Sequence, residues 1–111
     1  MLRNTAREIA IHLSYELSFN NTPIDTLLDQ RLTAETFSAL AEEDPVYAEA
    51  PNAKQAAYIR RLVKGVDDHA AELDSYISKY AKGWNFDRIP LVASAIMRVA
   101  MYEVLYMPDI P

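Results

Sequence analysis

The sequence contains no cysteine and only two glycines among its 111 residues. Without cysteine the chain has neither a disulfide framework nor a thiolate metal site. With glycine only at positions 65 and 83, sheets built from tight hairpins are disfavoured and long helices are favoured. The N-terminus has no apolar run behind basic residues, so it lacks the pattern of a secretory signal, and we expect a cytoplasmic protein.

The composition is otherwise that of one globular domain. Half of the residues are hydrophobic and 24% are charged, which suits a chain of this length with a single core. The formal net charge is −5 at pH 7, so charge alone does not indicate a nucleic-acid binder. Any RNA contact must come from a local basic patch on an acidic protein, which favours a factor that binds weakly on its own.

The most apolar stretch is residues 87–107, DRIPLVASAIMRVAMYEVLYM. It reads as one helix of about six turns, with Asp87 as its N-cap and Pro90 in its first turn. Nearly every direction around this helix is apolar, and Ser94 and Arg98 form a narrow polar strip. Such a helix is buried in protein or in lipid. We expect a central helix that upstream segments enclose, or a molecule from which part of the cover is missing.

Two charged residues inside this stretch bear on its environment. Arg98 and Glu103 would both be costly at bilayer depth, so a membrane span is disfavoured. In a protein core, the Glu103 carboxylate must find a partner or reach solvent. We interpret Glu103 as a capped or salt-bridged structural residue.

Helical periodicity predicts four earlier helices, at residues 3–19, 23–30, 34–42 and 53–82. Thr22, Thr33 and Asn52 are their expected N-caps where the chain restarts, and Gly65 indicates close approach of another helix. The proline-containing stretch DPVYAEAPN, residues 44–52, is the longest linker. We therefore expect a single domain made of an N-terminal helical subdomain, a linker and a C-terminal helical subdomain, at residues 1–44, 45–52 and 53–111.

Candidate catalytic and metal-binding groups are few. His12 with Glu16, and His69 with Glu72, stand at helical spacings that metal ligands can use, but each is a lone pair and reads better as a solvated helix face. The sequence has no glycine-rich phosphate loop, and no Ser-His-Asp or Cys-His set can be argued. We predict a non-enzymatic protein without a metal or other cofactor.

Basic residues form small groups on several helices. One group, Arg3 and Arg7, shares the first helix with Tyr15, and arginine and tyrosine are suited to bind phosphate and stack on bases. The other groups are Arg60, Arg61 and Lys64, and Lys79, Tyr80, Lys82 and Arg88. These residues fit an RNA-binding surface and ordinary solvated helix faces equally well.

Three stretches together resemble the NusB family of transcription antitermination factors: TAREIAIHLSYE, YIRRLVKGVDDHAAELDSYISKY and WNFDRIPLVASAIMRVAMYEVLYMPDIP. The resemblance covers nearly the whole chain in order, although residues 20–52 contribute little. It implies an all-α, NusB-like bundle of two packed helical subdomains. It also implies binding of boxA-type RNA with the small-subunit ribosomal protein NusE, in the RNA polymerase antitermination complex on ribosomal RNA operons.

The resemblance also implies which residues contact RNA. Arg3 and Arg7 match the family's arginine-rich start, and Tyr15 and Tyr80 match aromatic residues of the first and long helices. Asn4 and Thr5 stand where many members have further arginines, so we expect lower RNA affinity.

Family members continue past the closing Asp-Ile-Pro with about two more helices. We therefore expect that this sequence is a truncated form lacking the last helices, and that exposed core surface promotes self-association. Two alternatives stay open: a NusB-like interaction or regulatory domain of a larger protein, such as an RNA cytosine methyltransferase, and a helical scaffold with no RNA role.

Overall fold

The computed structural model describes residues 1–80 and 90–110, apart from the side chain of Tyr80. The described residues contain helices and no strand, which confirms the predicted all-α class. They form α1 (Arg3–Leu17), α2 (Ile24–Arg31), α3 (Ala34–Leu40), the short 3-10 helix η1 (Pro45–Tyr47), α4 (Ala53–Asp68), α5 (Ala70–Tyr80) and α6 (Leu91–Tyr106). The expected turn at Gly83, Trp84 and Phe86, and the expected cap Asp87, lie outside the described residues.

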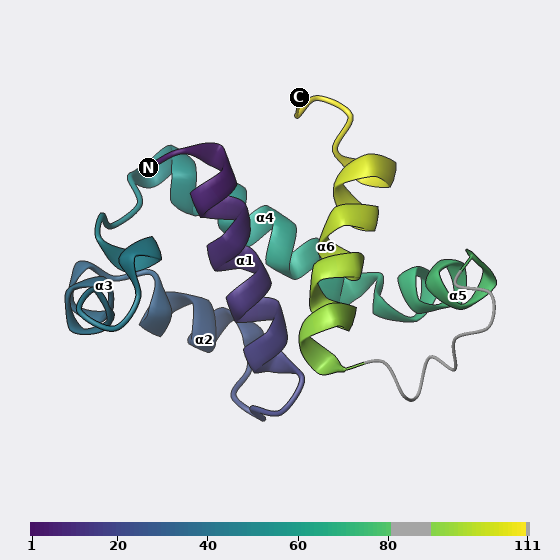
Figure 1. The fold of residues 1–111 in the computed structure, drawn as a ribbon, viewed down its shortest axis with the longest axis horizontal. Helices are drawn as coiled ribbons and strands as arrows, with labels where there is room; N and C mark the ends of the chain where they lie inside the picture. Colours follow the sequence, from purple (N-terminus) through teal and green to yellow (C-terminus); the bar gives the residue numbers. More distant parts are fainter. Residues whose placement is uncertain (81–89, 111) are drawn as a thin grey trace.

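Helices α1, α4 and α6 form the centre of the fold. Helix α1 crosses α4 and runs beside α6, while α2 and α3 lie at one end and α5 at the other (Figure 1). The apolar faces predicted for α1 and α4 meet in the core, which confirms their periodicity. The buried members are Ala6, Ile9, Ala10 and Leu13 of α1, and Ile59, Leu62, Val63 and Val66 of α4.

The predicted helix starts are confirmed at two positions and wrong at a third. Asn52 caps α4 through a reciprocal capping box with Gln55, and the Thr33 hydroxyl accepts from the backbone N–H of Thr36. Thr22 does not cap α2, because Pro23 occupies that position without a side-chain hydrogen bond. The backbone N–H of Thr22 instead donates to Asn20 Oδ1 at 2.9 Å, closing a turn of the kind that asparagine favours.

The prediction of one helix across residues 53–82 is wrong. Helix α4 ends at Asp68 and α5 begins at Ala70, with His69 between them at φ −111° and ψ 15°. The His69 ring packs against two tyrosines of α6 that also stack on each other, with centroid distances of 5.6 Å to Tyr102 and 4.4 Å to Tyr106. This aromatic contact coincides with the bend, which lets α5 pack against α6 where a straight helix would leave it.

Gly65 lies where α4 meets α6, as its position beside the apolar stripe predicted. A Cβ built on Gly65 would stand 2.1 Å from the Tyr102 ring. No side chain fits in that space without movement of the ring. Glycine therefore permits the close packing of these two helices.

Helix α6 differs from its prediction in both bounds and burial. It begins at Leu91, so Pro90 precedes the first turn and does not lie within it. The inward residues are buried, but a broad opposite side is exposed, with Val104 at 77%. The expectation that upstream segments enclose α6 completely is thus wrong for the described residues. Other exposed apolar side chains of α6 are Leu91, Val92, Ile96, Leu105 and Tyr106.

The expected polar strip of α6 faces inward. Ser94 is buried, and the guanidinium of Arg98 donates to both carboxylate oxygens of Asp74 on α5, at 2.6 and 2.7 Å. A paired guanidinium is much cheaper to bury than a lone one. In the part of the chain that the structure describes, no helix has the length and hydropathy needed to cross a bilayer.

Candidate nucleic-acid interface

Glu103 of α6 is the acceptor at the centre of a polar network. Arg7 Nε lies 2.5 Å from Glu103 Oε1, and Arg7 Nη2 lies 3.1 Å from Oε2. The Tyr58 hydroxyl of α4 donates to Oε2 at 3.0 Å. Since the Glu103 side chain is only 11% exposed, these bonds compensate its desolvation. The interpretation of Glu103 as a salt-bridged structural residue is confirmed.

The same network fixes Arg7 and Tyr58. Its hydrogen bonds to Glu103 raise the pKa of Arg7. Burial, and then the hydrogen bond to Glu103, raise the pKa of Tyr58, which keeps the phenol neutral. Arg7 also donates to Asn4 Oδ1 at 2.7 Å. Most of the donating edge of Arg7 is therefore already occupied within the protein.

Arg3, one helical turn before Arg7, has a different environment. Its guanidinium carbon lies 5.6 Å from the centroid of the Tyr58 ring, a cation–π contact that leaves the charge exposed to solvent. The Tyr58 hydroxyl is held by Glu103, so the ring under Arg3 has a fixed position. The position of Arg3 therefore depends on Tyr58 of α4 and Glu103 of α6 as well as on its own helix.

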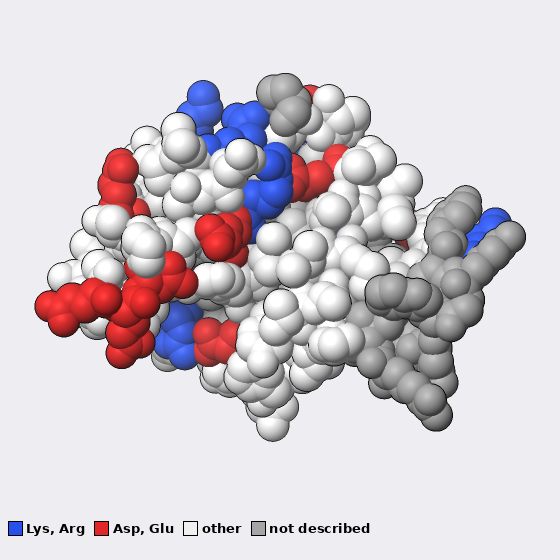
Figure 2. Space-filling model, viewed as in Figure 1, with Lys and Arg blue, Asp and Glu red and all other residues white. Residues whose placement is uncertain are grey.

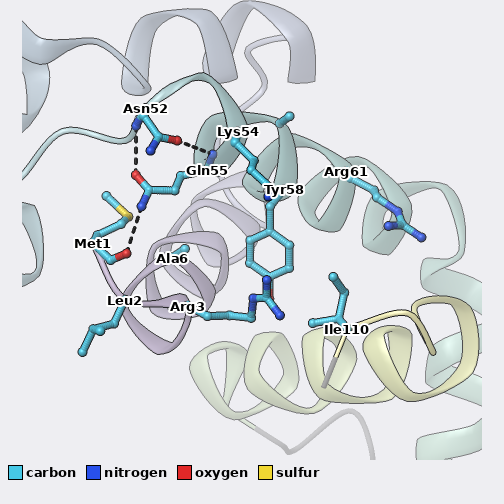
Figure 3. Close-up of a pocket in the computed structure, with 11 residues that line it drawn as sticks. Met1, Leu2, Arg3, Ala6, Asn52, Lys54, Gln55, Tyr58, Arg61 and Ile110 are labelled. Carbon is cyan, nitrogen blue, oxygen red and sulfur yellow. Dashed lines mark hydrogen bonds between the residues drawn. The ribbon is translucent and has the colours of Figure 1, made fainter.

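A pocket of about 440 Å³ opens beside Arg3, between the N-terminal turns of α1 and α4 (Figure 3). Lys54, Tyr58 and Arg61 of α4 contribute to its wall at i, i+4 and i+7, which places them on one helix face. Gln55 closes the pocket by donating to the Met1 carbonyl at 2.9 Å. Asn52 and several small or apolar residues complete the lining: Met1, Leu2, Ala6, Ala57 and Ile110.

Arg3 and Lys54 differ from most other basic residues in forming no ion pair with a carboxylate among residues 1–80 and 90–110, although Arg3 contributes to the lowered pKa of Asp109. Six cations pair with carboxylates: Arg7, Arg31, Arg60, Arg61, Lys64 and Arg98. In Figure 2, basic atoms gather over the N-terminal end of α1, and acidic atoms gather over the α3 end. The acidic protein therefore has a local basic surface at the pocket.

The remaining predicted RNA contacts lie elsewhere. Tyr15 is three turns from Arg3, roughly 18 Å along α1; its ring meets Phe19 edge-on at 5.0 Å and lines a separate groove with Ile11 and Val92. The side chain of Tyr80 lies outside the described residues. The structure brings Arg3 and Arg7 together and leaves Tyr15 apart from them.

Sequence reasoning missed Lys54 and Tyr58 as site residues. The signal was the i, i+4, i+7 spacing of Lys54, Tyr58 and Arg61 at the start of a capped helix. This signal is weak, because these residues border the much stronger apolar stripe of the same helix.

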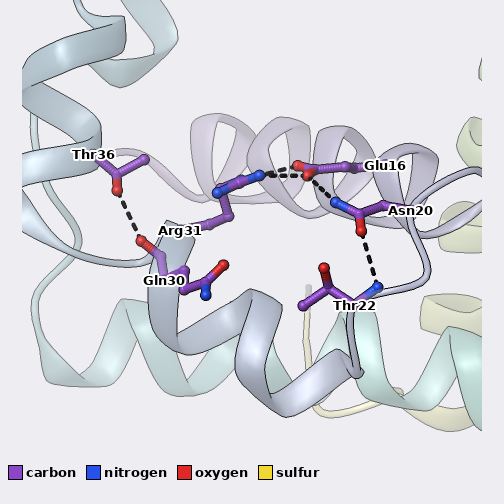
Figure 4. A network of polar contacts seen from close by, with 6 residues as sticks. All are labelled: Glu16, Asn20, Thr22, Gln30, Arg31 and Thr36. Atoms are coloured by element: carbon purple, nitrogen blue, oxygen red, sulfur yellow. Dashed lines mark hydrogen bonds and ion pairs between the residues drawn. The ribbon is translucent and has the colours of Figure 1, made fainter.

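The prediction that His12 and Glu16 form a solvated face is wrong. His12 Nδ1 lies 2.8 Å from the Tyr47 hydroxyl, and Glu16 binds Arg31 of α2 through two hydrogen bonds of 3.1 and 2.7 Å. Asn20 adds a third at 2.9 Å (Figure 4). The hydrogen bond from Arg31 is the main cause of the lowered pKa of Glu16. This network fastens α1 to α2.

For the second pair, the prediction of a solvated face is wrong for His69 and confirmed for Glu72, which is exposed. His69 is packed against Tyr102 and Tyr106, and Glu72 accepts a hydrogen bond from the Tyr106 hydroxyl. Across the described ranges, no group of three or more histidine or carboxylate side chains is arranged to hold a metal ion.

The fold and its surface define a class: an all-helical protein with a basic pocket, lined by one tyrosine, on an acidic molecule. A family model described as the NusB family matches residues 4–111. The chain belongs to this family.

Relatives support the assignment across the chain. It is 36% identical to the transcription antitermination protein NusB of Symbiobacterium thermophilum, over all of this chain and 69% of that protein. It is 32% identical to the proteins of the same name from Natranaerobius thermophilus and Bacillus subtilis, over all of this chain and 72% and 71% of theirs. The chain thus spans about 70% of the length of these relatives.

Proposed function

We propose that this chain is a transcription antitermination factor that binds boxA-type RNA together with the ribosomal protein NusE, within the RNA polymerase antitermination complex. The names of its relatives support the antitermination role. The observation that supports RNA binding is the pair Arg3 and Lys54, two cations that line one pocket of an acidic protein and form no ion pair in the described residues. Phosphate binding requires such available cations.

The basic residues have separate roles in this proposal. Arg3 contacts RNA phosphate directly, since its charge is exposed. Arg7 contributes through the edge that Glu103 and Asn4 leave free, and it also holds Glu103 beneath Tyr58. Tyr15 and Tyr80 are proposed as stacking residues for RNA that continues beyond the pocket.

The global charge explains the need for a partner. A net charge of −5 repels RNA at long range, and a patch of few cations provides little counterion release. A partner that adds cationic surface next to the pocket would offset both. The proposal therefore predicts that the chain binds boxA RNA weakly alone and more tightly with NusE.

Fluorescence anisotropy with labelled boxA RNA, with and without NusE, tests the function. Arg3→Ala should weaken binding about tenfold and reduce the slope of log K against log salt by roughly 0.7, the value for one phosphate contact in a single strand. Arg60→Ala is the matched control, because it removes an equal charge that pairs with Asp29 elsewhere. Equal binding of boxA and scrambled RNA, or equal effects of both variants, would contradict the proposal.

We also propose that the exposed apolar side of α6 promotes self-association, since large apolar patches rarely remain uncovered in monomers. Light scattering should show a mass that rises with protein concentration. A constant monomer mass at high concentration would refute this.

A further inference from the structure

We propose that the pocket between α1 and α4 binds one nucleotide of the single-stranded RNA, with its phosphate at Arg3 and Lys54 and its base against Tyr58. This inference rests on the proposed RNA-binding function. It adds two residues of α4, Lys54 and Tyr58, to the RNA-binding surface.

The charge of the pocket selects an anion. Among its lining residues are three cationic side chains, Arg3, Lys54 and Arg61, and no acidic one. Arg61 is neutralised by Asp109, which it binds through two hydrogen bonds of 3.0 and 3.2 Å. Arg3 and Lys54, on facing helices, form no ion pair in the described residues, although Arg3 lies near enough to Asp109 to help lower the pKa of that carboxyl. We place the phosphate between these two cations.

The shape and lining of the pocket select a ring beside that anion. Its volume of about 440 Å³ lies within the range of small-ligand pockets. Tyr58 offers an aromatic surface, and Ala6, Ala57 and Ile110 add apolar surface. A nucleotide joins an anion to a flat ring, and single-stranded RNA exposes both without the cost of opening a duplex.

The pocket is also preorganised. The Tyr58 hydroxyl is held by Glu103, which Arg7 fixes in turn, and the Asn52–Gln55 capping box fixes the first turn of α4. Neither the ring nor the turn carrying Lys54 needs to be ordered upon binding, which lowers the entropic cost. A rigid pocket of this kind favours one nucleotide position along the RNA.

The test uses the full chain with NusE and labelled boxA RNA. Lys54→Ala should weaken binding about fivefold to tenfold and reduce the salt slope by roughly 0.7. Lys64→Ala is the matched control: it is an exposed lysine of the same helix, but its ammonium pairs with Asp25 at 2.9 Å. Tyr58→Leu should weaken binding about tenfold, whereas Tyr58→Phe retains the ring, loses only its hydroxyl bond to Glu103, and should weaken binding much less. Thermal denaturation followed by circular dichroism identifies variants that fail to fold. Because Lys54 is exposed, Lys54→Ala should fold normally, so its binding result can be interpreted.

Photocrosslinking provides a second measurement. RNA with 4-thiouridine at successive positions should crosslink to Tyr58 from one position, and Lys54→Ala should reduce the yield. If the wild type binds RNA and the Lys54→Ala and Lys64→Ala variants bind it with equal affinity, the nucleotide pocket is refuted while the RNA-binding function stands. Absence of RNA binding by wild type would overturn both. Tight binding of uridine monophosphate alone would assign the pocket to a free nucleotide and overturn its role in RNA.

Discussion

Helices α4 and α6 have the same length, 16 residues each, and pack against one another at Gly65 and Tyr102. In α4 the apolar residues lie on one side and are buried, and Arg60, Arg61 and Lys64 on the other side pair with carboxylates. In α6 apolar residues surround the helix, yet only one side is covered.

The difference shows that the arrangement of apolar residues around a helix predicts its buried face, whereas their number alone does not. A one-sided pattern defines the buried face, because the polar side must remain in water. An all-round apolar helix defines no such face, and its burial depends on which neighbours are present. Helices α1, α4 and α5 contact α6 and leave the side carrying Val104 exposed.

Paired substitutions on α6 would produce the largest contrast. Val99 is fully buried and Val104 is 77% exposed. Val99→Asp places an unpaired carboxylate in the core and should cost at least about 3 kcal/mol, whereas Val104→Asp should change stability by about 0.5 kcal/mol or less. Urea denaturation measures both. Similar losses at the two positions would show that the outer side of α6 is covered in solution.

Arg7 tests how α6 accommodates its acidic residue. Arg7→Ala leaves the nearly buried Glu103 with only the Tyr58 hydroxyl, and should cost about 2 kcal/mol, less than a fully buried pair because Arg7 is 30% exposed. Arg60→Ala, which breaks an exposed pair of α4, should cost about 0.5 kcal/mol or less. A double-mutant cycle with Glu103→Gln isolates the coupling. If the effects of Arg7→Ala and Glu103→Gln on the free energy of unfolding are additive, the Arg7–Glu103 pair does not contribute to stability.

Much of the fold was predictable because it depends on local patterns. The buried stripes of α1 and α4, the Asn52 and Thr33 caps, and the meaning of Gly65 all follow from spacing within one helix. The bend at His69 was not predictable, since it coincides with a contact to tyrosines more than thirty residues away. The subdomain boundaries at 45–52 stay a prediction.

The candidate site was predictable only in part, for the same reason. Sequence identified Arg3 and Arg7 as basic, but it could not show that Glu103 occupies Arg7 while Arg3 is available. That distinction requires a contact between residues 96 positions apart. Lys54 likewise became a candidate only once most other cations were seen to be paired.

Gly65→Ala tests the close packing of α4 against Tyr102 of α6. The added methyl would clash with the Tyr102 ring, and overpacking typically costs 1–3 kcal/mol, while alanine regains up to about 1 kcal/mol of helix propensity. We expect a net loss of about 1 kcal/mol. In a Tyr102→Leu background the clash disappears, so Gly65→Ala should become neutral or stabilising. An unchanged loss in that background would attribute the effect to the backbone and not to the ring.

The smallest effect concerns Tyr58, where α4 meets Glu103 of α6. Burial and the hydrogen bond to Glu103 raise the pKa of Tyr58 above its ordinary value of 10.0. The unfolded chain therefore loses this proton first, so the stability it contributes is present below pH 10 and is lost as pH rises through the folded-state pKa. Tyr58→Phe cannot ionise, and its stability should fall less steeply above pH 10 than that of the wild type. Urea denaturation between pH 8 and pH 11 measures how the free energy of unfolding of each protein depends on pH. Parallel slopes would show that folding does not raise the pKa of Tyr58 and that its hydroxyl does not bind Glu103 in solution.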